Sequence, residues 1–192
     1  MHIALIGDLL HGRTAHSKAE GLNFFTQVEV DLIAPPLLAM PEKYIQDMQK
    51  NGYTIRIFSS MQDYISQKKL APKWYFTRPQ LERMGEEILK QEHTLRDTIT
   101  FHPEYLDIIK KQHANFKFYH PLPQHKEHPT IPVSLMDSPF NGIEKQARNG
   151  LYIRTVLLSA LAGNPYINDS FTGKTNPETT YSDDFYEEIK KS

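Results

Sequence analysis

Short apolar segments alternate with longer amphipathic segments along most of this chain, and this alternation is the feature that most restricts its fold. Strands separated by helical segments at this spacing predict right-handed βαβ units and a parallel sheet covered on both faces. We therefore expect an α/β fold, a Rossmann-like three-layer arrangement around a twisted parallel sheet of about five strands with helices on both faces. The expected strands are 3–6, 28–34, 53–58, 73–77 and 116–119, and the expected helices are 13–27, 41–50 and 61–69.

The composition excludes several classes of function. The 192 residues include 23% charged residues and no cysteine, and the formal net charge is -1. A chain with so little net charge and no long basic run is not expected to bind nucleic acid or an anionic membrane. The lack of cysteine excludes disulfides, thiolate nucleophiles and Cys-ligated zinc. No apolar run reaches the roughly 18 residues of a membrane span.

The N-terminal segment enters a strand pattern at once and lacks the basic region and cleavage site of a signal peptide. We therefore expect a cytoplasmic protein. Residues 1–163 are expected to form the α/β domain. Residues 164–192 are expected to be a C-terminal tail, for which a flexible acidic extension is the plainest interpretation.

Three polar stretches, 8–17, 78–80 and 120–124, each follow one of the expected strands. Ligands of open parallel sheets bind outside the carboxyl ends of the strands, near the point where the strand order reverses. The three stretches together therefore predict a single ligand site. Taken alone, Arg78 could be a surface residue after a strand, and the prolines at 121 and 123 could form only a rigid exit from a strand.

The first stretch resembles a nucleotide phosphate loop, G-x-x-x-x-G-K-[ST], except that Arg13 replaces the lysine. No second strand ends in the four apolar residues and aspartate that form the other motif of such a nucleotide site. An arginine fork suits bidentate recognition of a carboxylate, and a helix N-terminus favours negative charge. We interpret Arg13 as an anion-binding residue; a helix start that is merely polar is the alternative.

A second alternative is a metal site, because His113, His120, His125 and His128 lie close together in the sequence. The segment contains prolines and lacks the helical spacing of a ligand pair. A solvated loop is the better interpretation, and no metal is expected.

Four segments in order carry a resemblance to a known family: GDLLHGRTAHS, YFTRPQLER, FYHPLP and QARNGLYIRTVLLSAL. They are similar to motifs of aspartate carbamoyltransferase, in the C-terminal half that binds the amino acid, and the similarity covers about residues 2–163. Ornithine carbamoyltransferase typically carries H-C-L-P and an S-M-G motif, which this chain lacks. The aspartate branch is therefore favoured.

The resemblance implies a transferase that moves the carbamoyl group of carbamoyl phosphate to L-aspartate, an early step of pyrimidine biosynthesis, without metal or organic cofactor. It implies that Arg13, Arg78 and Gln80 bind L-aspartate, and that Leu122 and Pro123 offer backbone carbonyls to carbamoyl phosphate. The residues implied in supporting roles are Asp8, Thr14, His120, Glu82 and Arg83.

The family's second domain carries an S-T-R-T loop and an H-P-x-Q motif, and neither occurs in this chain. We therefore expect half of an active site, inactive alone, that works with a separate N-terminal carbamoyl-phosphate-binding domain or chain. The apolar helix 151–162 is expected to be covered by a partner chain, another copy or the tail, and an oligomer is favoured. The alternative is a non-catalytic paralogue that binds a partner subunit or a small acid, favoured by Gln124 and Leu81 where the family usually has Arg and often Lys.

Overall fold

The structure, a computed structural model, describes residues 1–80 and 91–163. The chain divides into two compact units, Met1–Gln146 and Ala147–Ser192. The proposed boundary between an α/β domain and a tail at residue 163 remains a prediction, and the tail itself lies outside the described residues.

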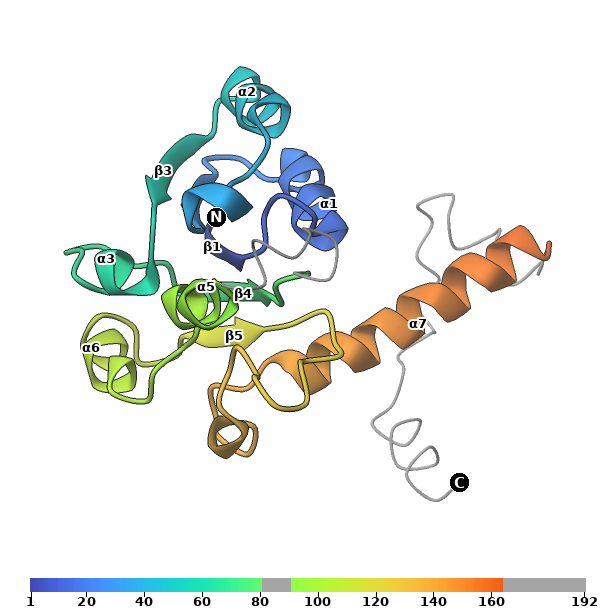
Figure 1. Ribbon diagram of the computed structural model, residues 1–192. Coiled ribbons are helices and arrows are strands. Elements are labelled where there is room, and N and C mark those ends of the chain that lie inside the picture. Colours follow the sequence, from blue (N-terminus) through green and yellow to red (C-terminus); the bar gives the residue numbers. More distant parts are fainter. Residues whose placement is uncertain (81–90, 164–192) are drawn as a thin grey trace. The chain divides into compact units, whose positions relative to one another are not determined.

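The first unit is built around a parallel sheet of five strands in the order β3-β2-β1-β4-β5 (Figure 1). The chain moves outward from β1 to β3 and then returns to β4 on the other side of β1, so the strand order reverses between β1 and β4. The fold class expected from the sequence is confirmed. The strands are β1 (His2–Gly7), β2 (Glu29–Ile33), β3 (Thr54–Phe58), β4 (Lys73–Thr77) and β5 (Lys117–Tyr119).

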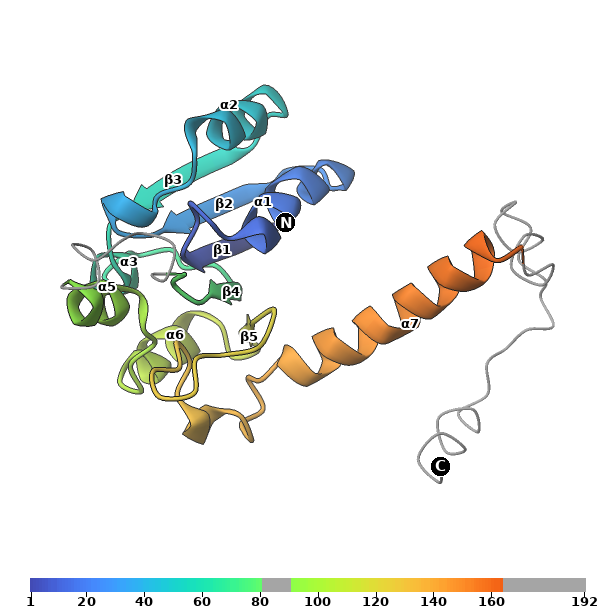
Figure 2. The same ribbon diagram turned by 45° about the vertical axis from the view of Figure 1, so that its right-hand side comes forward.

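Helices cover both faces of the sheet, as Figure 2 shows from a second side. Within residues 1–80 and 91–163 the α-helices are α1 (Arg13–Gly21), α2 (Glu42–Lys50), α3 (Met61–Ile65), α5 (Glu92–Ile99), α6 (Tyr105–Gln112) and α7 (Ile143–Leu161). Short 3₁₀ turns are η1 (Leu22–Phe24), η2 (Pro36–Leu38) and η4 (Val133–Leu135).

Two apolar cores lie on the two faces because alternate strand residues point in opposite directions. In β1, Ile3 and Leu5 pack with α1 and α2, whereas Ala4 and Ile6 pack with α3, α5 and α6. Trp74 is fully buried at the centre of the second core, where four aromatic rings surround it: Tyr64, Phe76, Phe101 and Phe116.

Several helix boundaries differ from those expected. The helix from Arg13 ends at Gly21 instead of near Gln27, and a 3₁₀ turn follows it. The helix from Met61 ends at Ile65 instead of Lys69. The sequence interpretation did not assign α5 and α6, each of which buries only two residues: Leu95 and Ile99 in α5, and Tyr105 and Ile109 in α6. Tertiary packing on the sheet, rather than local helix propensity, accounts for such short helices.

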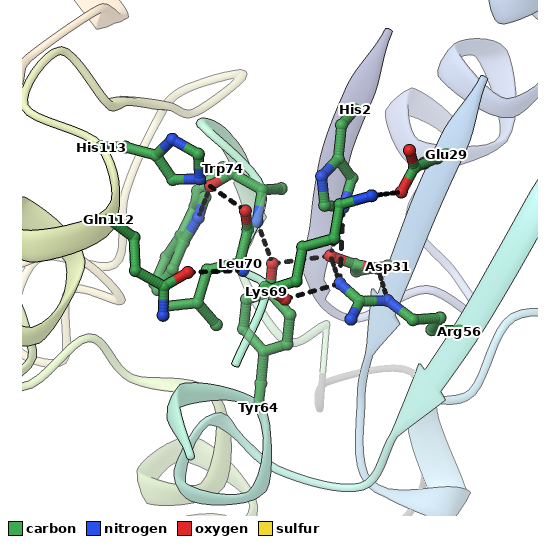
Figure 3. Close-up of polar contacts among 11 residues, drawn as sticks. His2, Glu29, Asp31, Arg56, Tyr64, Lys69, Leu70, Trp74, Gln112 and His113 are labelled. Carbon is green, nitrogen blue, oxygen red and sulfur yellow. Dashed lines mark hydrogen bonds and ion pairs between the residues drawn. The ribbon is translucent and has the colours of Figure 1, made fainter. Parts of the chain in front are cut away.

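A buried ionic network ties the amino-terminal half of the sheet together (Figure 3). The Asp31 carboxylate in β2 is fully buried and accepts two hydrogen bonds from the Arg56 guanidinium, both at 2.7 Å. His2 Nε2 and the Tyr64 hydroxyl each lie 2.7 Å from Asp31 Oδ2. Burial would raise the pKa of Asp31, but the hydrogen bonds from His2, Arg56 and Tyr64 outweigh burial and lower it. Asp31 is therefore a charged structural centre of the fold.

Helix α7 begins in the first unit, where Ile143 is buried in the core. Within the second unit its apolar side chains are exposed: Leu151, Ile153, Val156, Leu157, Leu158 and Leu161. That a partner chain, another copy or the tail covers them remains a prediction.

Candidate functional site

A cavity of about 260 Å³ lies beyond the carboxyl ends of β1, β4 and β5. This is the edge of the sheet where the strand order reverses, the usual ligand position in open parallel sheets. Residues from all three polar stretches line it: His11, Gly12, Arg13, Thr14, Thr77, Arg78, Gln80, His120, Pro121, Leu122 and Pro123.

Seven of the residues proposed from the sequence therefore line one cavity: Arg13, Thr14, Arg78, Gln80, His120, Leu122 and Pro123. An eighth, Asp8, is fully buried, and its side chain accepts hydrogen bonds from two of the lining residues, His11 and Gln80. Glu82 and Arg83 lie outside the described residues. The individual roles proposed for these residues remain predictions.

The loop after β1 requires glycine at two positions. Gly7 has φ of 113°, and a Cβ atom there would lie 2.0 Å from the Thr77 carbonyl oxygen in β4. A Cβ atom on Gly12 would lie 2.3 Å from the Asp8 carbonyl oxygen. Glycine thus lets the loop fold tightly against β4 and turn into α1, which begins at Arg13.

Asp8 joins the loop after β1 to the loop after β4. Its Oδ1 accepts a hydrogen bond from the His11 backbone N–H at 2.8 Å, and its Oδ2 accepts one from the Gln80 backbone N–H at 2.9 Å. His11 Nδ1 lies 3.2 Å from Oδ1. A buried carboxylate needs such partners, and here they come from both sides of the cavity.

Two further hydrogen bonds strengthen this connection. The Gln80 side-chain amide donates to the His11 carbonyl oxygen at 3.1 Å. The Thr77 hydroxyl is placed between the Ile6 and Asp8 carbonyl oxygens, at 3.1 and 3.2 Å. The cavity wall is therefore held by side chains from two neighbouring strand ends.

His120 supports the third side of the cavity in its neutral form. Burial, reinforced by the nearby positive charge of Arg78, lowers the pKa of His120 to about 4. Its Nδ1 accepts a hydrogen bond from the Leu122 N–H at 2.9 Å, so Nε2 carries the proton. The next residues adopt an unusual conformation, with φ of 56° at Leu122 and a cis peptide bond to Pro123. His120 thus holds the backbone that leads to Leu122 and Pro123.

The electrostatics of the cavity favour an anion. Two arginines line it, and among its described lining residues there is no aspartate or glutamate. The Asp8 carboxylate nearby already accepts hydrogen bonds on both oxygens. Since Arg13 begins α1, the positive end of the helix dipole also lies at the cavity. A small carboxylate or phosphate is the class of ligand that this arrangement can hold.

His11 is a lining residue that the sequence interpretation missed. It lies between Asp8 and Gly12, at a position that the motif leaves unspecified, so no motif drew attention to it. The available signal was its nearness to Asp8, because aspartate side chains in turns often hydrogen-bond the backbone of residues that follow closely in the chain.

Gln124, a departure from the family pattern, has a local structural task. Its side-chain oxygen accepts a hydrogen bond from the Ile131 backbone N–H at 3.0 Å, which closes the loop between them.

The alternatives raised by the sequence have less support. No group of three or more His, Asp or Glu side chains among residues 1–80 and 91–163 is arranged to hold a metal. The His125 and His128 rings stack on each other, and both the Glu127 and His128 backbone N–H groups donate to His125 Nδ1.

No helix in the described part of the chain is long and apolar enough to span a membrane.

A larger cavity, of about 490 Å³, is lined by side chains of both charges: Glu92, His93, Arg96, Asp97, Thr100, His128 and Pro129. Arg96 and Glu92 pair with each other at 2.6 Å. None of the residues named in its lining belongs to the loops after β1 and β4, and those residues include two carboxylates, Glu92 and Asp97, but only one arginine, Arg96, so it does not favour an anion. It is therefore a weaker candidate than the smaller cavity.

The fold and the cavity define a class: a Rossmann-like α/β domain with an arginine-lined cavity at the strand-order reversal. The sequence matches the family described as aspartate/ornithine carbamoyltransferase, Asp/Orn binding domain, over residues 1–161. The chain belongs to this family, as the four motifs indicated.

Individual relatives agree with this assignment. The chain is 57% identical to Protein PyrBI of Treponema denticola over 173 residues, which is 90% of this chain and 31% of that protein. It is 33% identical to the aspartate carbamoyltransferase catalytic subunit of Methanosarcina barkeri over 165 residues, or 85% of this chain and 49% of that one. The chain thus spans about a third of PyrBI and about half of the catalytic subunits.

Solved structures lead to the same family. The catalytic subunit of M. jannaschii aspartate transcarbamoylase superposes with a TM-score of 0.70 at 27% identity, covering 88% of this chain and 50% of that one. Aspartate transcarbamoylase from Trypanosoma cruzi in complex with N-(phosphonacetyl)-L-aspartic acid gives a TM-score of 0.67 at 28% identity, covering 80% and 47%.

Proposed function

We propose that this chain is the L-aspartate-binding half of an aspartate carbamoyltransferase. In the whole enzyme the reaction would join carbamoyl phosphate and L-aspartate to give N-carbamoyl-L-aspartate and phosphate, in pyrimidine biosynthesis. The observation that carries the proposal is that Arg13 and Arg78, which follow different strands, line a single cavity. Arginines converging from two loops suit the two carboxylates of a dicarboxylic amino acid.

In this proposal Arg13 and Arg78 bind the carboxylates of aspartate, and Gln80 helps to position the amino acid. Leu122 and Pro123 offer backbone carbonyls to the carbamoyl group. The reaction depends on orientation and charge stabilisation, without a cofactor. His120 holds the carbonyl-bearing segment in place, because its Nδ1 is bonded to the Leu122 N–H.

The free chain should bind aspartate weakly. Each charge-assisted hydrogen-bonded contact contributes about 1.5–3 kcal/mol, so two arginine–carboxylate contacts contribute about 3–6 kcal/mol, whereas association costs about 4–15 kcal/mol. Millimolar or weaker affinity follows.

Turnover by the chain alone is not expected. The chain spans about half of the catalytic subunits that it matches, and the groups that hold the phosphate in the family belong to the other domain. The partner would be a separate N-terminal carbamoyl-phosphate-binding domain or chain, and oligomerisation and a cytoplasmic location stay predictions.

Binding can be tested on the free chain by NMR titration with succinate, a dicarboxylate without the amine. We expect shifts confined to the cavity loops, and we expect Arg78→Ala to weaken binding at least about tenfold. Arg148→Ala changes an exposed arginine that is not among the lining residues of the cavity; it serves as the matched control and should bind like the wild type. Succinate shifts spread evenly over the surface, or unchanged binding by Arg78→Ala, would contradict the proposal.

Activity can be tested by mixing the chain with a separately produced carbamoyl-phosphate-binding domain. We expect carbamoyl-aspartate from the mixture, none from either part alone, and none from a mixture with Arg78→Ala. Product from the pure chain alone would refute the predicted inactivity.

The second candidate function is a non-catalytic module that binds a partner subunit or a small acid. Gln124, which stands where the family usually has Arg and closes a local loop, favours it. Dicarboxylate binding without any activity in the mixture would support this alternative.

A further inference from the structure

A second positively charged hollow adjoins the candidate site on the side of α1. It has a volume of about 370 Å³ and is lined by Arg13, Thr14, Ser17, Lys18 and Tyr75. Arg13 and Thr14 line both this hollow and the cavity described above. The motif that carries the family resemblance ends at Ser17, so neither that motif nor the proposed reaction assigns a role to Lys18.

The helix geometry explains why these side chains converge. Residues three and four apart are neighbours on a helix surface. Arg13 and Ser17 form one such pair, and Thr14 and Lys18 form another. Tyr75 in β4 lies beneath α1 and is only 4% exposed, so its ring forms the floor of the hollow.

Lys18 is held over this floor without a carboxylate partner in the described part of the chain. Its Nζ lies 4.1 Å from the centre of the Tyr75 ring. Burial lowers the pKa of Lys18. A second cation, Arg13, lies at the rim, and the described lining includes three hydroxyl-bearing residues and no aspartate or glutamate.

A second lysine of the same chain shows the contrast. Lys43 Nζ lies 4.5 Å from the centre of the Tyr44 ring, in a similar stacking arrangement. The cavity that Tyr44 lines also contains Glu20 and Asp47, so carboxylates balance the positive charge there. The positive charge of the Lys18 hollow has no such compensation among its described lining residues.

We propose that this hollow is a second anion-binding site, in which Lys18, Arg13 and the hydroxyls of Thr14 and Ser17 hold a phosphate-type dianion. A tetrahedral dianion fits the donors present, because a lysine, an arginine and two hydroxyls offer more hydrogen-bond donors than one carboxylate group accepts. Arg13 lines both the hollow and the candidate site, so the two sites are coupled. An anion in the hollow competes with a dicarboxylate in the candidate site for the guanidinium of Arg13. This site does not depend on the proposed function.

The test is an NMR titration of the free chain with inorganic phosphate, at constant ionic strength maintained with sodium chloride. We expect the Tyr75 ring signals to shift and the pKa of Lys18 to rise on phosphate addition, because a bound dianion favours the charged amine. Lys18→Met should weaken phosphate binding by about three- to thirtyfold, whereas Lys18→Arg should retain it. Lys43→Met is the matched control and should bind phosphate like the wild type.

Phosphate that leaves Lys18 and Tyr75 unaffected in the wild-type chain, or that binds equally well to Lys18→Met, overturns the proposal. Succinate is the second arm. If succinate moves the Lys18 signals and phosphate does not, the hollow is an extension of the dicarboxylate cavity, and the phosphate site is refuted. If phosphate binds at Lys18 while succinate shows no binding, the second site stands and the proposed aspartate site fails.

Discussion

Substitution of Asp8 by asparagine tests whether one buried carboxylate holds the candidate site together. The change keeps the shape of the side chain but removes its charge and replaces one acceptor oxygen by an NH₂ donor. In the wild type both oxygens accept backbone hydrogen bonds, from His11 and from Gln80. In the Asp8→Asn variant the side chain can satisfy only one of these two N–H groups.

The expected cost follows from these contacts. One hydrogen bond to a charged acceptor is lost, which costs about 1.5–3 kcal/mol, and a buried N–H is left unpaired, which adds about 1–3 kcal/mol. Since a rotated side chain relieves part of the second contribution, we expect the free energy of unfolding to fall by about 2–5 kcal/mol. Equilibrium urea denaturation followed by circular dichroism measures this difference.

Asp47→Asn is the matched control, because Asp47 pairs with Lys50 at the surface, where both side chains are mostly exposed. Its unfolding free energy should stay within about 0.5 kcal/mol of the wild type. If Asp8→Asn is as stable as Asp47→Asn, the argument that Asp8 joins the two loops is refuted.

Three further predictions concern pH and the backbone. The pKa of His120 in the folded chain is lowered to about 4, so the unfolded chain binds this proton at higher pH than the folded chain. The free energy of unfolding should therefore fall as the pH drops from about 6.5 to 4. The His120 imidazole should titrate near pH 4 by NMR, and a midpoint near the ordinary value would contradict its burial. The lowered pKa of Asp31 stabilises the fold at pH values above the unfolded pKa of about 3.9, and this stabilisation is lost as the pH falls through the folded pKa. In urea denaturation at low pH, the free energy of unfolding should therefore fall less steeply with pH for Asp31→Asn than for the wild type. The same steepness in both would count against the network. Gly7→Ala should lower the free energy of unfolding by at least about 2 kcal/mol, because Gly7 has a positive φ and a Cβ atom there would lie 2.0 Å from the Thr77 carbonyl oxygen. Gly21→Ala is the control, because a Cβ atom at Gly21 meets open space; thermal denaturation should show it to be neutral or stabilising.

Much of the fold was predictable because it depends on local patterns. The five strands are apolar segments, and their neighbours in the chain are amphipathic, so the parallel α/β class followed from the sequence. The ends of the helices from Arg13 and Met61 were predicted too far along the chain. The reason is that packing on the sheet, and not periodicity alone, decides where such short helices stop.

The sequence by itself determined which residue types follow each strand, and the polar stretches at three strand ends were enough to predict that their residues share one cavity. Only the tertiary structure decided how that site is held. The hydrogen bonds of Asp8 to Gln80 and of Gln80 to His11 join positions about seventy residues apart, and no local pattern encodes such a distance. The same holds for Lys18, whose amine meets the Tyr75 ring only because α1 packs across β4. Strand order and register bring these groups together, and both arise from burial of the whole sheet.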